Sequence, residues 1–261
     1  MYSVPMKILL TNDDGIYAEG LWALQQELAL RHSVSVVAPD RERTAVGHGI
    51  TLHSPLRVHS VSMNGSGEGL AVNGTPADCV KLGVLELLAT KPDIVISGIN
   101  QGANVGININ YSGTVSAARE AALYGLPAIA VSAEKSPRHH LAGIAVFITD
   151  LAEKTLEKGL PFGTILNVNF PGVPMDRISG VRVSSQSISL LGDYYEKRND
   201  PRNRPYYWPG CDTQCGFVNP DSDGAALKDN YISITPIKCD MTDYGLMDDL
   251  KTWNIVLKSN Q

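Results

Sequence analysis

Two adjacent aspartates follow the first apolar run of the chain, in the motif TNDDG. If Asp13 and Asp14 were both ionised in a partly buried position, they would repel each other unless a cation compensated their charge. Mg²⁺ and Mn²⁺ are hard divalent ions that prefer oxygen ligands and supply that charge. A helix cap before a tight glycine turn is the alternative, and it explains one carboxylate better than two. The motif therefore favours a metal or catalytic site.

Two further motifs add neutral oxygen donors and positive charge. APDRERTAVGHG carries Arg41 and Arg43, which suit an anionic substrate, and the Thr44 hydroxyl, which can ligate a metal or contact a phosphoryl oxygen. SGINQGANVG offers the amide oxygen of Asn100 among glycines that let the backbone approach a ligand closely. A solvated charged loop and a plain glycine-rich loop are the respective alternatives. The glycine spacing matches neither a nucleoside triphosphate loop nor a dinucleotide fingerprint.

YSGTVSAARE indicates an anion site, because Ser112, Gly113 and Thr114 stand at the expected start of a helix. Hydroxyl groups and free backbone amides at a helix N-terminus attract phosphate. Helix capping is the alternative, favoured for this motif alone and more strongly for NGTP at residues 73–76. Together with the acidic and amide oxygen donors, however, the motif completes the groups needed for metal-assisted phosphoryl hydrolysis.

The elements that must position these motifs alternate along the chain. Short apolar runs typical of buried strands occupy residues 7–11, 33–38, 93–97, 127–132 and 164–169, with an extended segment at 50–61. Helical patterns occupy residues 18–31, 76–89, 114–124 and 141–158. This alternation predicts an α/β fold, a three-layer sandwich whose mostly parallel sheet is covered by helices on both faces. Ligands bind such sheets beyond the carboxyl ends of the strands, where the motifs would meet.

The pattern changes after residue 172, so we expect a core at residues 1–172 and a C-terminal extension at 173–261 within one continuous domain. Residues 182–189 and 231–236 look like strands of a different, antiparallel region. The turn-rich stretch between them contains the aromatic residues Tyr194, Tyr195, Tyr206, Tyr207 and Trp208. It predicts a long loop or arm that packs on its own domain, on a second subunit or on the base of a substrate.

The composition is that of an ordinary globular protein: 261 residues, of which 43% are hydrophobic and 19% charged. A net charge of −5 gives no general attraction to a nucleic acid polymer or an anionic membrane. The N-terminus lacks the features of a signal peptide, and no apolar run approaches the roughly 20 residues of a spanning helix. We therefore expect a soluble, cytoplasmic protein. Four cysteines are too few for a disulfide framework.

The motifs TNDDG, VVAPDRERTA, NGTPADCV, SGINQGANVG, YSGTVSAAREA and NVNFP occur in the order seen in the survival-protein SurE family of nucleotidases, which the chain resembles over residues 7–171. A looser resemblance continues through residues 222–237. The resemblance implies a Rossmann-like fold and a 5′/3′-nucleotidase, often with some polyphosphatase activity. It also implies an extended C-terminal element that is exchanged between the subunits of a homodimer or homotetramer.

The resemblance also implies roles for individual residues. One Mg²⁺ or Mn²⁺ ion per subunit would be held by Asp13, Asp14, Thr44 and Asn100. Asp13, Asp14 and Asn100 would be catalytic, and the phosphate would contact Asn12, Ser112, Gly113 and Thr114. The chain departs from the family at Thr44, where serine is usual, and at Gly47, His48 and Gly49, which replace the more usual serine and asparagine. Threonine keeps the hydroxyl and adds a methyl group, so we expect metal binding to be retained.

The resulting hypothesis is a metal-dependent phosphomonoesterase that acts on nucleoside 5′-monophosphates, with 3′-monophosphates and short polyphosphate as further substrates. The ion would polarise the phosphoryl group and lower the pKa of a bound water that attacks phosphorus in line. Three alternatives stay open at this point. They are a phosphatase with an aspartyl-phosphate intermediate, a response-regulator-like switch, and a nucleotide-binding module without turnover.

Overall fold

A nine-stranded sheet forms the centre of the computed structural model, which describes residues 5–63, 67–134, 140–188, 193–211, 219–253 and 255. The strand order is β3-β4-β2-β1-β5-β6-β7-β11-β8. The strands from β4 to β7 in this order run parallel, whereas β3 and β11 pair antiparallel with β4 and β7. The bounds are β1 Lys7–Thr11, β2 Ser33–Pro39, β3 Val58–Met63, β4 Gly67–Val72, β5 Ile94–Gln101, β6 Ala128–Ala133, β7 Thr164–Phe170, β8 Gly180–Val183 and β11 Tyr231–Lys238.

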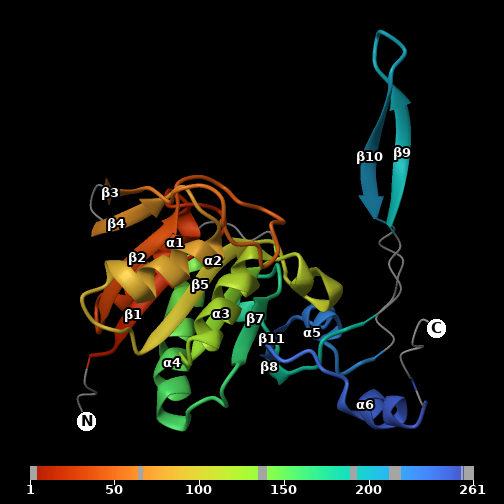
Figure 1. Cartoon of the computed structure of the whole chain (residues 1–261). Helices are drawn as coiled ribbons and strands as arrows, with labels where there is room; N and C mark the ends of the chain where they lie inside the picture. The colour runs from red at the N-terminus through yellow and green to blue at the C-terminus, as the bar shows by residue number, and fades with distance from the viewer. Residues whose placement is uncertain are drawn as a thin grey trace, which may run out of the picture.

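Helices cover both faces of this sheet (Figure 1). Helices α1 (Glu19–Leu28) and α4 (Leu141–Lys158) share one hydrophobic cluster with Ile8 and Leu10 of β1. Helices α2 (Pro76–Leu82) and α3 (Gly113–Leu123) share a second cluster with Leu9. Successive side chains of a strand point to opposite faces, so β1 is apolar throughout because both of its faces are buried. The predicted α/β sandwich with a mostly parallel sheet is confirmed.

Most elements lie within a few residues of their predicted positions, and the differences have local causes. The helix expected at 76–89 ends at Leu82 and continues as a π-helical turn, η1 (Gly83–Leu87). Of the extended segment at 50–61, only its last part belongs to a strand, β3. Strand β4 was not predicted, since its sequence GEGLAV opens with glycines that interrupt the apolar alternation.

The expectation that the C-terminal strands form a different region is wrong, because β8 and β11 extend the main sheet. Strand β11 pairs antiparallel with β7, and β8 pairs parallel with β11. Without β11, the outer edge of β7 would expose unpaired backbone groups. Strand β8 covers residues 180–183 rather than 182–189, and residue 189 lies outside the described part of the chain. The division of the chain at residue 172 stays a prediction.

The predicted aromatic arm contains a β-hairpin, β9 (Asp193–Asn199) paired with β10 (Pro205–Cys211). Figure 1 shows that this hairpin stands clear of the central sheet. Helices α5 (Asp223–Lys228) and α6 (Tyr244–Lys251) complete the C-terminal part. Within the described ranges, every helix is too short or too polar to cross a membrane.

Helix α1 approaches β5 more closely than any side chain would allow. A Cβ atom on Gly20 would lie 2.3 Å from the carbonyl oxygen of Ile99. The glycine therefore sets the separation between α1 and the strand whose end carries Asn100.

We predict that Gly20→Ala lowers the free energy of unfolding by about 1–3 kcal/mol, because the added methyl group forces the helix away from β5. Gly245→Ala in the exposed helix α6 is the matched control, since among the described residues its Cβ would meet only Asp243 Oδ1, at 3.4 Å. Alanine is about 1 kcal/mol better than glycine in a helix, so the control should be neutral or stabilising. Urea unfolding of both variants measures the difference, and equal losses would contradict the close-packing explanation.

Candidate functional site

A cavity of ≈ 600 Å³ lies at the carboxyl ends of β1 and β5. The predicted metal ligands Asp13, Asp14, Thr44 and Asn100 all line it, together with Glu42 and Ser112. The structure therefore brings together residues from segments that are distant in the sequence. This is the location that the parallel sheet predicts for a ligand.

Asp13 is buried at the end of β1, with 4% of its surface exposed. Burial raises the pKa of its carboxyl group, while hydrogen bonds from the hydroxyl and the backbone amide of Thr114 act in the opposite direction. Gly113 permits this arrangement, since a Cβ there would lie 2.7 Å from the Cβ of Asp13. The start of α3 therefore packs directly against the carboxylate.

Asp14 is half-buried beside it. Burial, followed by the neighbouring charge of Asp13, raises the pKa of Asp14 to about 6. The backbone amide of Gln101, at the end of β5, donates to the carboxylate and offsets part of this shift. Strands β1 and β5 thus meet at the acidic pair.

Asn100 reaches the cavity because β5 is irregular at its end. The pairing of β5 with β6 shifts register between Ser97 and Asn100. The Asn100 side-chain nitrogen donates to the carbonyl oxygen of Gly102 at 2.8 Å. This bond uses the amide nitrogen, so the side-chain oxygen is the atom that can ligate a cation.

The loop that carries Thr44 is fastened directly to the acidic turn. The Arg43 amide donates to the carbonyl oxygen of Asp13 at 2.7 Å. Gly15 has φ +95°, and a Cβ there would lie 2.8 Å from the carbonyl carbon of Arg41. Because only glycine allows both this conformation and this approach, Gly15 lets the two motifs lie against each other.

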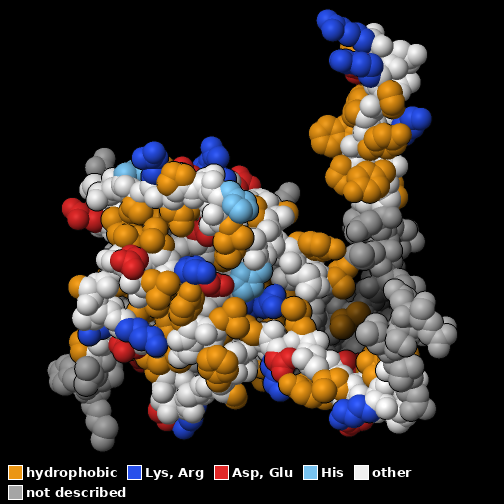
Figure 2. Space-filling model, viewed as in Figure 1, with side chains coloured by type: hydrophobic (Ala, Val, Ile, Leu, Met, Phe, Trp, Pro, Cys, Tyr) orange, Lys and Arg blue, Asp and Glu red, His pale blue; other side chains and the backbone are white. Residues whose placement is uncertain are grey.

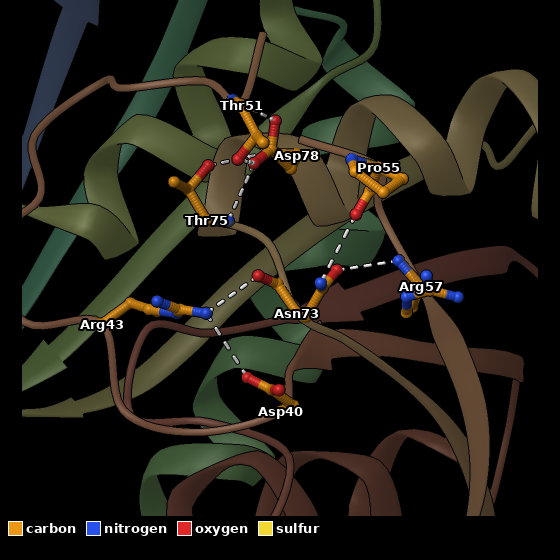
Figure 3. Close-up of polar contacts among 8 residues, drawn as sticks. All are labelled: Asp40, Arg43, Thr51, Pro55, Arg57, Asn73, Thr75 and Asp78. Carbon is orange, nitrogen blue, oxygen red and sulfur yellow. Dashed lines mark hydrogen bonds and ion pairs between the residues drawn. The ribbon is translucent and has the colours of Figure 1, made fainter. Parts of the chain in front are cut away.

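Asn73 ties both ends of the same loop (Figure 3). Its carbonyl oxygen accepts a hydrogen bond from Arg43 Nη2 at 2.8 Å, and its side-chain oxygen accepts one from the Arg57 amide at 2.7 Å. Arg43 also faces Asp40, with 3.5 Å between Nη2 and Oδ1. Arg43, which the sequence suggested as an anion-binding side chain, is therefore engaged in holding the loop.

The NGTPAD motif does more than cap a helix. Its capping role is confirmed, because Thr75 accepts a hydrogen bond from the Asp78 amide at 3.1 Å and completes a capping box. The Asp78 carboxylate also accepts bonds from the amide and the hydroxyl of Thr51, at 3.0 and 2.6 Å (Figure 3). Although burial acts to raise it, these bonds hold the pKa of Asp78 below its ordinary value.

His48 and Glu120 link the loop to the helix behind the phosphate motif. His48 Nε2 lies 2.8 Å from Glu120 Oε2, and Glu120 is buried on α3. A His that replaces the usual residue of the family thus has a structural partner 72 positions away. The sequence shows no local signal for this pair.

Further polar residues hold the wall of the cavity, and no role was predicted for Asn167, Asn169 or Asp223. The backbone amide of Asn104 donates to Asn169 Oδ1 at 2.8 Å, and the Asn104 carbonyl oxygen accepts a bond from Asn167 Nδ2 at 2.8 Å. The buried Asp223 carboxylate accepts bonds from the amides of Gly106 at 2.8 Å and Ser187 at 3.1 Å. The motif NVN, which carries Asn167 and Asn169, was the sequence signal that could have pointed to the contacts with Asn104.

The predicted phosphate residues divide into two groups. Ser112 lines the cavity, and its Oγ caps α3 by accepting a bond from the Val115 amide at 3.1 Å. Thr114 and Asn12 lie fully buried behind the cavity wall, where Thr114 binds Asp13. Asn12 Nδ2 donates to the carbonyl oxygen of Gly15 at 2.9 Å and so supports the turn.

The donors at the cavity fit a hard divalent cation. They comprise two adjacent carboxylates, an amide oxygen and a hydroxyl, all oxygen ligands of the kind that Mg²⁺ and Mn²⁺ accept. Among the described residues, no cluster of three or more His, Cys, Asp or Glu side chains has the arrangement of a metal site, so the neutral donors are needed to complete this one. The raised pKa values of Asp13 and Asp14 mark a charge that a cation would compensate.

The family model described as Survival protein SurE matches residues 8–192. The chain belongs to the SurE family. Its matched range includes every residue discussed at the acidic turn, the DRERT loop and the start of α3. The Rossmann-like fold implied by the sequence motifs accords with this membership.

Relatives of this family align over nearly the whole chain. A 5′-nucleotidase SurE of Desulfatibacillum aliphaticivorans is 58% identical and covers 96% of this chain and 99% of its own. A 5′-nucleotidase SurE of Syntrophobacter fumaroxidans is 48% identical and covers 96% of this chain and 100% of its own. The crystal structure of the SurE protein from Aquifex aeolicus superposes with a TM-score of 0.80 at 38% identity, over 94% of this chain and 98% of that one.

We predict that Asp14→Asn raises the melting temperature of the protein in chelator at pH 7.5 by a few degrees. Because folding raises the Asp14 pKa from 3.8 to about 6, the folded chain holds this proton more tightly than the unfolded chain. The stability contributed by this group is therefore greatest at low pH and falls as the pH rises from 3.8 to about 6. At pH 4 the gain from Asp14→Asn should largely disappear.

Thermal unfolding at both pH values, with exposed Asp221→Asn as the control, measures this difference. A gain for Asp14→Asn that is the same at pH 4 and pH 7.5 would show that ionisation of Asp14 in the folded state is not its cause.

Proposed function

We propose that this chain hydrolyses nucleoside 5′-monophosphates to the nucleoside and phosphate, with one divalent metal ion per subunit. The observation that carries the proposal is the pair of adjacent carboxylates with raised pKa values, Asp13 and Asp14, beside Asn100 and Thr44 at one cavity. The relatives named 5′-nucleotidase SurE, which align over 96% of the chain, support the same reaction.

Asp13, Asp14, Thr44 and Asn100 would hold the ion, which we propose to be Mg²⁺ or Mn²⁺. When bound, it supplies charge stabilisation for the phosphoryl group and lowers the pKa of water. The Thr114 hydroxyl and amide hold the Asp13 carboxylate in a fixed orientation. Asp14 is the more exposed carboxylate of the pair, so it is the one that can take a proton from the attacking water at Oδ.

Ser112, at the N-terminus of α3, would contact the phosphoryl oxygens together with the Gly113 amide. Thr114 and Asn12 would act one layer further back, on Asp13 and on the turn at Gly15. The cavity of ≈ 600 Å³ is large enough for a mononucleotide. Tyr111, which is 55% exposed at its wall, offers an apolar ring to the nucleoside. We extend the proposal to nucleoside 3′-monophosphates and short polyphosphate as secondary substrates.

We predict that Asp13→Asn lowers Mn²⁺-stimulated phosphate release from AMP by about 10³-fold or more, because the variant loses one charged ligand of the ion and the several kcal/mol of charge stabilisation that the ion supplies. Exposed Asp176→Asn is the control and should keep full activity. Circular dichroism and melting temperature check that both variants fold.

The same assay separates the proposal from its alternatives. Multiple turnovers with AMP exclude a nucleotide-binding module and a response-regulator-like switch. A phosphoenzyme trapped by acid quench would favour an aspartyl-phosphate intermediate. Near-normal activity of Asp13→Asn would refute the proposed metal site.

We propose further that the hairpin β9–β10 joins subunits of a cytoplasmic homodimer or homotetramer. Figure 2 shows apolar side chains along the hairpin and basic side chains at its far end. Tyr195, Tyr207 and Trp208 are exposed by 71%, 56% and 56%. Aromatic side chains so exposed on a projecting element are typical of an interface.

We predict that the triple substitution Tyr195→Ser, Tyr207→Ser and Trp208→Ser converts the oligomer to a smaller species, because it removes the apolar surface that would be buried between subunits. Light scattering after size-exclusion chromatography measures the mass. Phe162→Ser, at a residue 79% exposed on the main body, is the control. An unchanged mass for the triple variant would contradict the role of the hairpin.

A further inference from the structure

A third carboxylate, Glu42, lines the same cavity as the proposed metal ligands. Its Oε1 atom accepts a hydrogen bond from the hydroxyl of Thr44. The charge of Glu42 also adds to the acidic environment of Asp13 and Asp14. A third negative group would repel a phosphate substrate, so its position beside Thr44 calls for a physical explanation.

The backbone holds Glu42 and Thr44 in a defined relation. The residues on either side of Glu42 are fastened to the acidic turn, Arg41 by its close approach to Gly15 and Arg43 by its bond to the carbonyl of Asp13. The Arg43 side chain leaves toward Asn73 (Figure 3), while Glu42 and Thr44, two residues apart, both line the cavity.

A hydroxyl group has one proton to donate and two lone pairs to offer. When Thr44 donates its proton to Glu42, both lone pairs of the hydroxyl oxygen become available to a cation. The methyl group of threonine restricts rotation about χ1, so few side-chain orientations are available. The hydrogen bond to Glu42 selects one of them. A bond to a charged acceptor is about twice as strong as one between neutral groups.

We propose that Glu42 is a positioning residue for Thr44, because it accepts the hydroxyl proton and thereby directs the hydroxyl oxygen toward the divalent cation. This inference rests on the proposed function, since it assumes that Thr44 is a ligand. Glu42 acts through Thr44 and is not itself a ligand. Glu42 would orient a ligand without binding the ion itself, as the groups that hydrogen-bond to metal ligands do in other proteins.

The test is a double-mutant cycle on Mn²⁺ affinity, measured by calorimetric titration of the chelator-treated full chain. Glu42→Met removes the acceptor at similar length, and Thr44→Val removes the hydroxyl at similar shape. Glu42→Met alone should weaken Mn²⁺ binding about 10-fold or more, the range expected for loss of a group that hydrogen-bonds to a metal ligand. In the Thr44→Val background, the same Glu42→Met change should have little further effect.

Two conservative variants separate the hydrogen bond from the charge. Glu42→Gln keeps an acceptor oxygen without the charge, so it should lose less Mn²⁺ affinity than Glu42→Met does. Thr44→Ser keeps the hydroxyl, so Glu42→Met should again weaken binding in that background. Glu42 and Thr44 are both exposed, so these variants should fold, and the melting temperature checks this.

Four outcomes would overturn the inference. Equal weakening by Glu42→Gln and Glu42→Met would assign the effect to charge. Equal weakening in the presence and absence of the Thr44 hydroxyl would make Glu42 an independent ligand. If Glu42→Met bound Mn²⁺ with unchanged affinity while Asp13→Asn abolished binding, Glu42 would have no role at the site. The proposed function would still stand. If the wild-type chain bound no Mn²⁺, the metal site itself would fail, and this inference with it.

Discussion

Two negative charges placed side by side in a buried turn are the constraint around which this site is built. Moving a carboxylate out of water costs free energy, and a second one beside it adds repulsion. The chain meets this cost partly with donors: Thr114 binds Asp13, and the Gln101 amide binds Asp14. The remainder shows as raised pKa values for both groups, a pattern that is common at functional sites.

Much of what the family motifs contain serves to bring backbone segments into contact. Gly15 and Gly113 are glycines because another part of the chain lies where their side chains would be. Asn73 and Asp78 hold the loop that carries Thr44, and neither lines the cavity. A motif at this site can therefore be essential without touching the substrate, since a displaced loop would separate the oxygen donors that a cation needs together.

The sequence was sufficient for the parallel core and for the convergence of the proposed ligands. Short apolar runs such as that of β1, alternating with helical patterns, indicate strands that are buried on both faces, and the carboxyl ends of parallel strands lie at one edge of the sheet. The partners of polar residues were not predictable. Arg43 was expected to meet an anion but binds Asn73, and His48 pairs with a glutamate on α3. Such contacts depend on loop paths, and no local spacing encodes them. Strands β8 and β11 were assigned to another region because pairing at a sheet edge is likewise non-local.

The hydrogen bonds that Asp223 accepts from the amides of Gly106 and Ser187 have a consequence for the order in which the molecule is made. The acidic turn leaves the ribosome early, yet one support of the cavity wall is supplied by a residue more than 200 positions later. The parallel layers can collapse during translation, whereas the wall near Gly106 gains this support only when residue 223 has emerged. A nascent chain would thus carry its carboxylates for most of synthesis without this support for the wall of the pocket.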